Sequence, residues 1–316
     1  MKKLPKNRKK ILAVTLGDPG GIGPEVIFKS LQSRLPKCAV IIIGTSQYYP
    51  DSSIPKIRHI GEIQKRGVYF YHIDPKILKE PSFQYVKTGV EFALTKKIDA
   101  LVTAPVSKEK WLKAGIKYKG HTEYLAKTAG SRDHSMFFWS ENLKVSLFTI
   151  HIPLKKVFGA IKKREIKRFI RSLDRELQKW FNQKFTFLIS GLNPHAGEEG
   201  FLGQEEIEEI IPALKSLEAE GERQSENRIH IEGPFPPDVV FLKAMGKKNT
   251  VVVSWYHDQG LIPFKLLNIH SGVNLTLGLP YIRTSPVHGT AYDIAGKNIA
   301  NPSSMTAAIK LAEELA

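Results

Sequence analysis

The sequence predicts an α/β fold built on a largely parallel sheet. Short apolar runs alternate with amphipathic stretches along most of the 316 residues, and this strand–helix–strand rhythm is typical of a parallel sheet covered by helices. Several of the runs are apolar at every position, as expected for strands that are buried on both faces. Hydrophobic residues make up 42% of the chain and charged residues 25%, which is ordinary for a globular protein and argues against disorder of the whole chain.

The elements of this fold are clearest in the N-terminal third. Strands are expected at 11–16, 39–45, 68–73 and 100–105, and helices at 24–35 and 88–98. The alternation continues beyond residue 180, where apolar runs such as FTFLIS and TVVVSW are separated by helical patterns. We find no internal repeat and no low-complexity linker, so we expect two lobes of one unit and not two tethered domains.

Charge and composition narrow the class of protein. The formal net charge is +16, and six of the first ten residues are basic. Such an excess attracts phosphorylated metabolites, coenzymes and nucleic acids, but no zinc-finger spacing or aromatic RNA-binding motif is present, so we expect no nucleic-acid partner. No apolar run approaches the roughly 18 residues that span a bilayer, so we expect no membrane segment. Cys38 alone cannot form an intramolecular disulfide; we expect it to be a small core residue of a cytoplasmic protein.

Glycine, proline, histidine and aspartate gather at the ends of the apolar runs, where open α/β sheets bind ligands. The segment GDPGGIGPEV at 17–26 follows a strand and precedes a helix, and it is either a tight turn or part of a ligand loop. Further along, His121 and Thr122 begin a helix in GHTEYLA. The free N–H groups of a helix start favour anions, although Thr122 could equally serve as a cap.

Three histidines stand in equivalent settings at strand ends: His151, His195 and His257. One such histidine is more often a structural residue, but neutral imidazole is also the commonest protein ligand for a borderline divalent metal. Three imidazoles would leave positions open for a substrate hydroxyl. Asp258 follows His257 directly, and Asp238 lies in the segment GPFPPDVVF. Either aspartate could orient a ligand histidine, contact a substrate amine, or cap the loop backbone.

Two C-terminal stretches add an anion clamp and a loop. Lys265, Asn274 and Arg283 are the polar members of apolar, turn-rich segments, and together they would grip a phosphate or carboxylate. The segment 285–302 is rich in small residues, so its backbone can approach a flat ligand closely. Asp293 within it could bind both hydroxyls of a ribose and would repel a 2′-phosphate. From the residues alone, this segment is also simply a well-structured loop.

These stretches, taken in order, resemble one family across about residues 11–310. The motifs GDPGGIGPE, TAPVSK, GHTE, NPHAGE, GPFPPD, YHDQG and VNLTLGLPYIRTSPVHGTA are similar to those of the 4-hydroxythreonine-4-phosphate dehydrogenases. The resemblance implies the fold of the isocitrate and isopropylmalate dehydrogenases. One lobe would comprise 1–125 and 276–316, the other 126–275, with the active site in the cleft between them and the dimer interface on the central lobe.

The resemblance also implies the site residues. His151, His195 and His257 would hold one divalent cation (zinc, magnesium or cobalt), shared between the two subunits of a homodimer. The substrate would contact His121, Thr122, Lys265, Asn274 and Arg283. The wider dehydrogenase group implies NAD binding by His288, Gly289, Asp293 and Asn301, with Asp293 favouring NAD over NADP. Tyr292 departs from that group, because isopropylmalate dehydrogenases usually carry proline there.

The implied reaction is the oxidation of 4-phosphohydroxy-L-threonine to a β-keto acid, which loses CO₂ to give 3-amino-2-oxopropyl phosphate, in pyridoxal phosphate biosynthesis. The general base would be Lys265 or Asp258. One alternative is a related dehydrogenase that acts on another phosphorylated hydroxy acid, such as a four-carbon sugar acid phosphate. A more distant alternative is a metallohydrolase without redox chemistry, since three histidines and an open metal would suffice for it.

Overall fold

The computed structural model describes residues 9–34, 36–74, 80–118, 120–223 and 228–316. Most of the lysine-rich N-terminal tail therefore lies outside the described residues. The chain forms two compact units, one made of 1–132 and 279–316 and the other of 133–278. The sequence puts these divisions nearby, at 125/126 and 275/276.

Unit 1 is built on a sheet whose described strands all run parallel. Their order is β3-β4-β2-β1-β5-β12. The strands are β1 Ile11–Thr15, β2 Ala39–Gly44, β3 Lys56–Ile57, β4 Gly67–His72, β5 Ala100–Thr103 and β12 Ile282–Pro286. All residues of β1, β2, β5 and β12 are buried. This burial explains why β1, β2 and β5 are largely apolar without alternation, whereas β12 buries the polar residues Arg283, Thr284 and Ser285.

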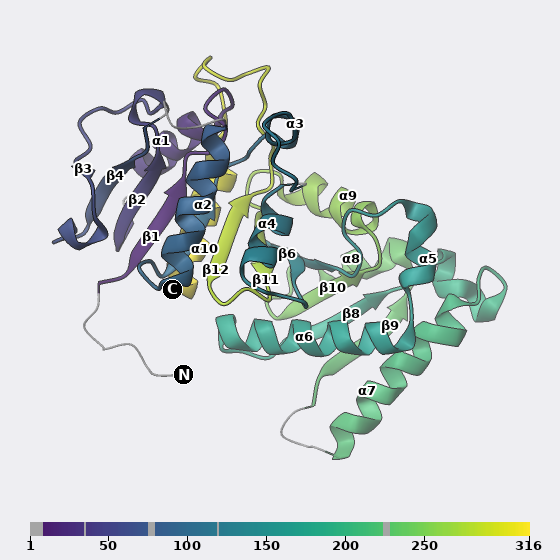
Figure 1. The fold of residues 1–316 in the computed structure, drawn as a ribbon. Helices are drawn as coiled ribbons and strands as arrows, with labels where there is room; N and C mark the ends of the chain where they lie inside the picture. Colours follow the sequence, from purple (N-terminus) through teal and green to yellow (C-terminus); the bar gives the residue numbers. More distant parts are fainter. Residues whose placement is uncertain (1–8, 35, 75–79, 119, 224–227) are drawn as a thin grey trace. The chain divides into compact units, whose positions relative to one another are not determined.

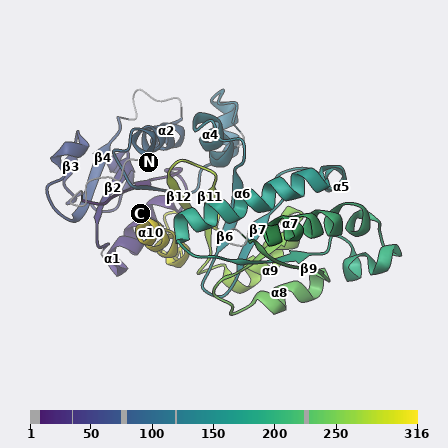
Figure 2. The same ribbon diagram turned by 90° about the horizontal axis from the view of Figure 1, so that it is seen from below.

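Helices cover both faces of this sheet. Figure 2 shows α2 on one side and α1 and α10 on the other. The helices are α1 Gly23–Ser33, α2 Pro81–Leu94, α3 Lys108–Lys113, α4 His121–Thr128 and α10 Ser303–Leu315, with short 3-10 turns at Ser46–Tyr48 and Ile60–Glu62. Gly89 of α2 lets the helix approach the sheet, because a Cβ there would lie 2.7 Å from the side chain of Leu101.

Unit 2 has a mixed sheet in the order β11-β6-β7-β10-β8-β9. Its strands are β6 Ser135–Trp139, β7 Lys144–Leu147, β8 Thr186–Ser190, β9 His230–Phe235, β10 Thr250–Ser254 and β11 Val273–Leu277. Strand β6 pairs antiparallel with both β7 and β11, whereas β7, β10, β8 and β9 pair in parallel. This combination gives the mixed, largely parallel sheet that the sequence predicts.

The helices of unit 2 include the long amphipathic α6, which spans Lys163–Phe181 and ends at Asn182 in a left-handed conformation (φ 52°). Figure 1 shows it in teal beneath the strands of this unit. The other helical elements are Leu154–Lys156, α5 Val157–Ala160, Pro194–Gly200, the π turn Glu206–Ile210, α7 Ile211–Arg223, α8 Pro237–Ala244 and α9 His257–Asn268.

The predicted strands and the first helix are confirmed, with ends that shift by one or two residues. The helix expected at 88–98 is wrong in its bounds. It begins at Pro81, where the Glu80 carboxylate accepts a hydrogen bond from the Ser82 N–H, and it ends at Leu94, before Lys96 turns to φ 56°. Cys38 is buried, as expected, and burial together with the nearby Glu313 raises its pKa to about 12. None of the described helices has the length and apolarity to cross a membrane.

Candidate active site

A buried cation forms the centre of the first part of the site, in unit 1. Arg283 lies on β12 with only 2% of its surface exposed, and it donates to the Thr103 hydroxyl from Nη2 at 2.6 Å and from Nε at 3.2 Å. Thr103 is the last residue of β5, and Arg283 is the second residue of its parallel neighbour β12, where it pairs with Leu101. Burial lowers the pKa of Arg283 to about 10, so the guanidinium stays charged at neutral pH and favours an anionic partner.

His121 accompanies this guanidinium at the start of α4. Burial lowers the pKa of His121 well below its ordinary value, and the positive charges of Arg283 and Lys108 lower it further. The imidazole is therefore neutral at pH 7, and its buried Nε2 has no hydrogen-bond partner among the residues that the structure describes. A buried polar atom of this kind needs a partner, and a bound ligand would supply one.

The structure thus brings together two residues that the sequence singled out, His121 and Arg283. It adds Thr103 and Lys108, which the sequence analysis did not include among the site residues. Thr103 ends β5 and Lys108 begins α3, both within TAPVSK, and the position of this motif after a buried strand was the available signal. Thr122 is the second residue of α4, which follows Gly120 with φ 133°, a value that favours glycine. The region offers a guanidinium, an ammonium, an imidazole and a helix start, a set that suits a phosphate or carboxylate.

The second part of the site lies in unit 2, where two of the three histidines meet. The rings of His151 and His257 have centroids 5.6 Å apart. Parallel pairing of β7 with β10 explains this proximity, since it continues past the strands through hydrogen bonds from Phe148 N to Ser254 O and from Thr149 N to Trp255 O. His257 begins α9, and its Nδ1 lies 2.6 Å from the Asp258 carboxylate. That contact fixes the ring and leaves Nε2 for a ligand.

His195 sits on an unusual backbone. It begins a run of six residues with positive φ, from His195 (53°) to Gly200 (94°). The buried carboxylate of Glu206 holds the segment before this turn, because it accepts from the N–H groups of Leu192 and Asn193 at 2.7 and 2.9 Å and from the Asn193 side chain at 2.8 Å. Sequence reasoning missed Glu206, which reads as one of several glutamates on a helical stretch.

Within one chain, His195 does not join the other two imidazoles. The described residues contain no group of three or more His, Cys, Asp or Glu side chains that could hold a metal ion. His195 instead lines a pocket of about 390 Å³ with Asp238, Tyr256 and Gln259. The Gln259 side chain links the segment before His257 to the segment before His195. It accepts a hydrogen bond from Trp255 N at 2.7 Å in the first and donates one to Gly191 O at 2.8 Å in the second.

The remaining predicted substrate residues also belong to unit 2. Lys265 is exposed on α9, two turns after His257. Asn274 lies on β11 opposite Phe138 of β6. Neither residue belongs to the same unit as Arg283, the third member of the predicted clamp.

The loop expected to bind the coenzyme, 288–301, lies in unit 1 beside the glycine-rich turn at 17–26. The Ile22 N–H donates to Thr290 O at 2.9 Å, and the Ala300 N–H donates to Glu25 Oε1 at 2.8 Å. Around Gly289 there is open space, since a Cβ there would meet nothing within 4 Å. The carboxylate of Asp293 is exposed. These features leave room for a flat ligand to approach the backbone, as a coenzyme loop requires.

The fold defines a class, the α/β proteins built as two units with a large, mostly parallel arrangement of strands. The fold alone is shared with a terephthalate 1,2-cis-dihydrodiol dehydrogenase from Burkholderia xenovorans, at 23% identity over 97% of this chain and 98% of that one, with a TM-score of 0.63. Within this class, the chain belongs to the family of the pyridoxal phosphate biosynthetic protein PdxA, whose model matches residues 72–312.

Individual relatives support this assignment over nearly their full length. A 4-hydroxythreonine-4-phosphate dehydrogenase from Aquifex aeolicus is 44% identical, covering 97% of this chain and 98% of that protein. A D-threonate 4-phosphate dehydrogenase from Pectobacterium atrosepticum is 37% identical over 97% and 99%. The crystal structure of a 4-hydroxythreonine-4-phosphate dehydrogenase from Klebsiella pneumoniae superposes with a TM-score of 0.83, at 36% identity over 98% and 99%. The chain is therefore an enzyme of the dehydrogenase type, which argues against the metallohydrolase alternative.

Proposed function

We propose that this enzyme oxidises 4-phosphohydroxy-L-threonine with NAD and a divalent cation. The observation that carries the proposal is the buried anion site of unit 1, where the Arg283 guanidinium lies near a neutral imidazole with an unpartnered buried Nε2. A phosphorylated hydroxy acid supplies the anionic oxygens that these groups need. The family membership and the name of the Aquifex relative support the same substrate.

The chain's own residues would bind and orient this substrate. We assign the anionic groups to Arg283, Lys265 and Asn274, and further substrate contacts to His121 and Thr122. Neutral His121 can accept or donate one hydrogen bond through Nε2, so it discriminates between oxygen orientations without adding charge. Holding the carbon that carries the hydroxyl at a fixed distance from the coenzyme converts hydride transfer into an effectively unimolecular step.

We assign the divalent cation, whether zinc, magnesium or cobalt, to His151, His195 and His257. The donor set suits a borderline cation, and the Asp258 contact to His257 is typical of the carboxylate that orients a metal-binding imidazole. When bound, the cation would make the substrate hydroxyl more acidic. The candidates for the general base are Lys265 and Asp258. Asp258 contacts His257, and Lys265 would have to lose its proton before it could act as a base.

We further propose a homodimer in which His195 of one subunit complements His151 and His257 of the other. The apolar surface of α8 and α9 supports this assembly. Leu242, Ile262, Leu266 and Leu267 are 50–79% exposed there, and they line an apolar pocket of about 550 Å³. Exposed apolar side chains clustered in this way mark an interface between proteins.

NAD is assigned to the loop that contains His288, Gly289, Asp293 and Asn301, and it would accept the hydride. The exposed Asp293 carboxylate can accept hydrogen bonds from both ribose hydroxyls and would repel a 2′-phosphate, so NAD is preferred to NADP. The β-keto acid that results would lose CO₂ to give 3-amino-2-oxopropyl phosphate. We assign the reaction to the cytoplasm, which suits a chain with one buried, unpaired cysteine.

A second substrate is supported by one observation. Relatives named D-threonate 4-phosphate dehydrogenase match 97% of the chain at 37% identity, and their substrate carries a hydroxyl where 4-phosphohydroxy-L-threonine carries an amine. The same anion site would bind both compounds. The alternative is therefore oxidation of this four-carbon sugar acid phosphate.

One assay separates these functions. Purified enzyme is given NAD, one divalent cation and each phosphorylated substrate in turn, and NADH formation and phosphate release are followed together. We expect NADH with 4-phosphohydroxy-L-threonine and a kcat/KM at least about tenfold lower with D-threonate 4-phosphate, a difference of ~1.4 kcal/mol. The reverse preference would establish the alternative substrate, and phosphate release without NADH would reject both.

A further inference from the structure

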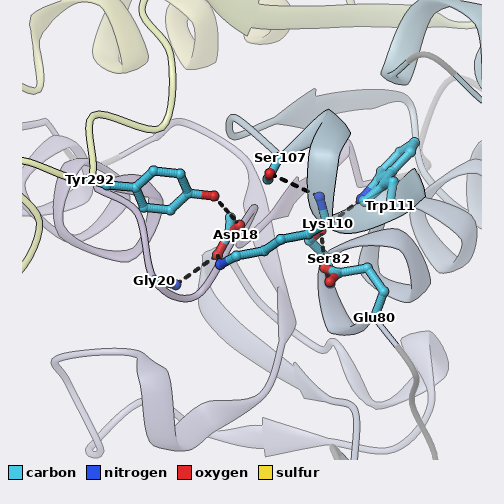
Figure 3. Close-up of polar contacts among 8 residues, drawn as sticks. All are labelled: Asp18, Gly20, Glu80, Ser82, Ser107, Lys110, Trp111 and Tyr292. Carbon is cyan, nitrogen blue, oxygen red and sulfur yellow. Dashed lines mark hydrogen bonds and ion pairs between the residues drawn. The ribbon is translucent and has the colours of Figure 1, made fainter. Parts of the chain in front are cut away.

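One buried carboxylate, that of Asp18, links the glycine-rich turn to the loop that we assign to the coenzyme. Asp18, in the turn after β1, is 1% exposed. Its Oδ1 accepts from the Gly20 N–H at 2.9 Å and from Lys110 Nζ at 2.8 Å, and its Oδ2 accepts from the Tyr292 hydroxyl at 2.5 Å (Figure 3). Three segments that are far apart in the sequence therefore meet at one side chain, and we call this group the Asp18 cluster (Asp18, Lys110 and Tyr292).

Lys110 anchors the Asp18 cluster to a fixed element. Its backbone N–H donates to the Ser107 hydroxyl, which caps α3, and the adjacent Trp111 donates from Nε1 to the Ser82 hydroxyl at 2.8 Å (Figure 3). Ser82 in turn donates to Glu80 at the start of α2. Burial alone would lower the pKa of Lys110, but the Asp18 carboxylate and the Tyr292 side chain outweigh it and raise the pKa, so the ion pair persists throughout the neutral range.

Tyr292 is the member that belongs to the loop. The residue is 45% exposed, and Lys110 Nζ lies 4.9 Å from the centroid of its ring. The preceding residue, Ala291, has φ 44°, a strained value for a residue with a Cβ. Such strain persists where surrounding contacts hold the backbone, and the bond from the Tyr292 hydroxyl to a buried carboxylate is such a contact. The next residue is Asp293, which we assign to the ribose.

We propose that Tyr292 is a positioning residue that pre-organises the coenzyme loop through Asp18, an inference that rests on the proposed use of NAD. A loop held in its binding conformation loses less conformational entropy when the ligand binds. The hydroxyl of Tyr292 should therefore strengthen NAD binding without touching the coenzyme. The glycine-rich turn would then support the loop. Gly21 has no side chain, so Thr290 O can lie close to it, whereas a Cβ at this position would lie only 2.8 Å from that oxygen.

The test compares Tyr292→Phe with Tyr48→Phe, which removes a hydroxyl from another exposed tyrosine of unit 1. Two quantities are measured without turnover: hydrogen exchange of the amides in 288–301 in the absence of ligand, and the Kd of NAD by calorimetry. For Tyr292→Phe we expect faster exchange in the loop and a Kd and KM for NAD about tenfold higher, or ~1.4 kcal/mol. The kcat, the KM of the phosphorylated substrate and the Tm should match those of Tyr48→Phe.

Each contrary result has a separate meaning. Faster loop exchange with an unchanged Kd for NAD would overturn the role in coenzyme binding while leaving the proposed reaction intact. Unchanged exchange would show that the hydroxyl does not restrain the loop, and it would also overturn the inference. A wild-type enzyme that binds no NAD would reject the proposed coenzyme, and the inference with it.

Discussion

The proposed anion site of unit 1 and the proposed imidazole site of unit 2 differ in how many of their residues a single chain brings together. Arg283, Thr103 and His121 are brought together within one unit, and the guanidinium is 2% exposed. In unit 2, only His151 and His257 meet among the described residues, and the side chain of His257 is 36% exposed. In our proposal, the first site is formed by folding of one chain, whereas the second is completed by assembly of two chains. The two sites should therefore respond differently to mutation and to mixing of subunits.

The largest expected effect comes from the imidazoles. His195→Ala and His257→Ala should each lower kcat at least about 10³-fold, because the proposed cation loses a ligand. If His195 comes from the second subunit, mixing and refolding the two inactive variants together should restore up to about a quarter of wild-type activity. Half of the dimers would be mixed, and each mixed dimer would contain one intact site.

The control for this experiment is His195→Ala mixed with His195→Ala, which should stay inactive. Activity is followed as NADH formation, and circular dichroism confirms that each variant is folded. No recovery in the first mixture, despite exchange of subunits, would mean that one chain supplies the whole imidazole site.

The pre-formed anion site should show no such rescue. Arg283→Lys keeps the charge but loses the planar pair of donors, so kcat/KM for the phosphorylated substrate should fall about 10²-fold, or ~2.7 kcal/mol. The matched control is Arg58→Lys, a change at an exposed arginine of the same unit. A drop of less than about threefold in Arg283→Lys would remove this residue from substrate binding.

A smaller effect is expected from substitution of Glu206, whose carboxylate holds the segment before the His195 turn. Glu206→Gln replaces an acceptor of three hydrogen bonds with an amide, so the free energy of unfolding should fall by about 1–3 kcal/mol and kcat by about tenfold. Glu205→Gln is the control, since Glu205 accepts from the Asn193 side chain alone among the contacts seen. Equal losses in both variants, by urea unfolding and turnover, would contradict a special role for Glu206.

The smallest expected effect is a change of Tm with pH, which arises from two histidines of unit 1. Burial lowers the pKa of His121 and of His288, and nearby positive charges lower that of His121 further, so the folded state takes up their protons less readily than the unfolded chain. Stability is therefore greatest above the unfolded value of about 6.5 and falls as the pH drops below it. The Tm should fall by a few degrees between about pH 7.5 and 5.5. His121→Gln should reduce this change more than substitution of the exposed His270, and an identical pH dependence would contradict the assignment.

Much of unit 1 could be predicted from the sequence because its central strands β1, β2 and β5 are buried at every position and are followed by turn-forming residues. The runs 11–16 and 39–45 correspond to β1 and β2 almost residue for residue. The bounds of α2 could not be predicted, because its first turn, PSFQ, shows little helical periodicity and begins at a proline capped by Glu80. The β6–β7 hairpin was also missed, since FFW and KVSL carry no strong turn signal between them.

The sequence by itself determined the kinds of chemistry available: an arginine after an apolar run, imidazoles after strands, and a small-residue loop with an aspartate. The tertiary structure alone decided which of these groups meet. Parallel pairing of β7 with β10 brings His151 to His257, and the turn after β1 brings Asp18 to Tyr292, 274 residues away. Contacts of this kind depend on strand order and register, which arise from burial of the whole sheet and leave no signature in the local sequence.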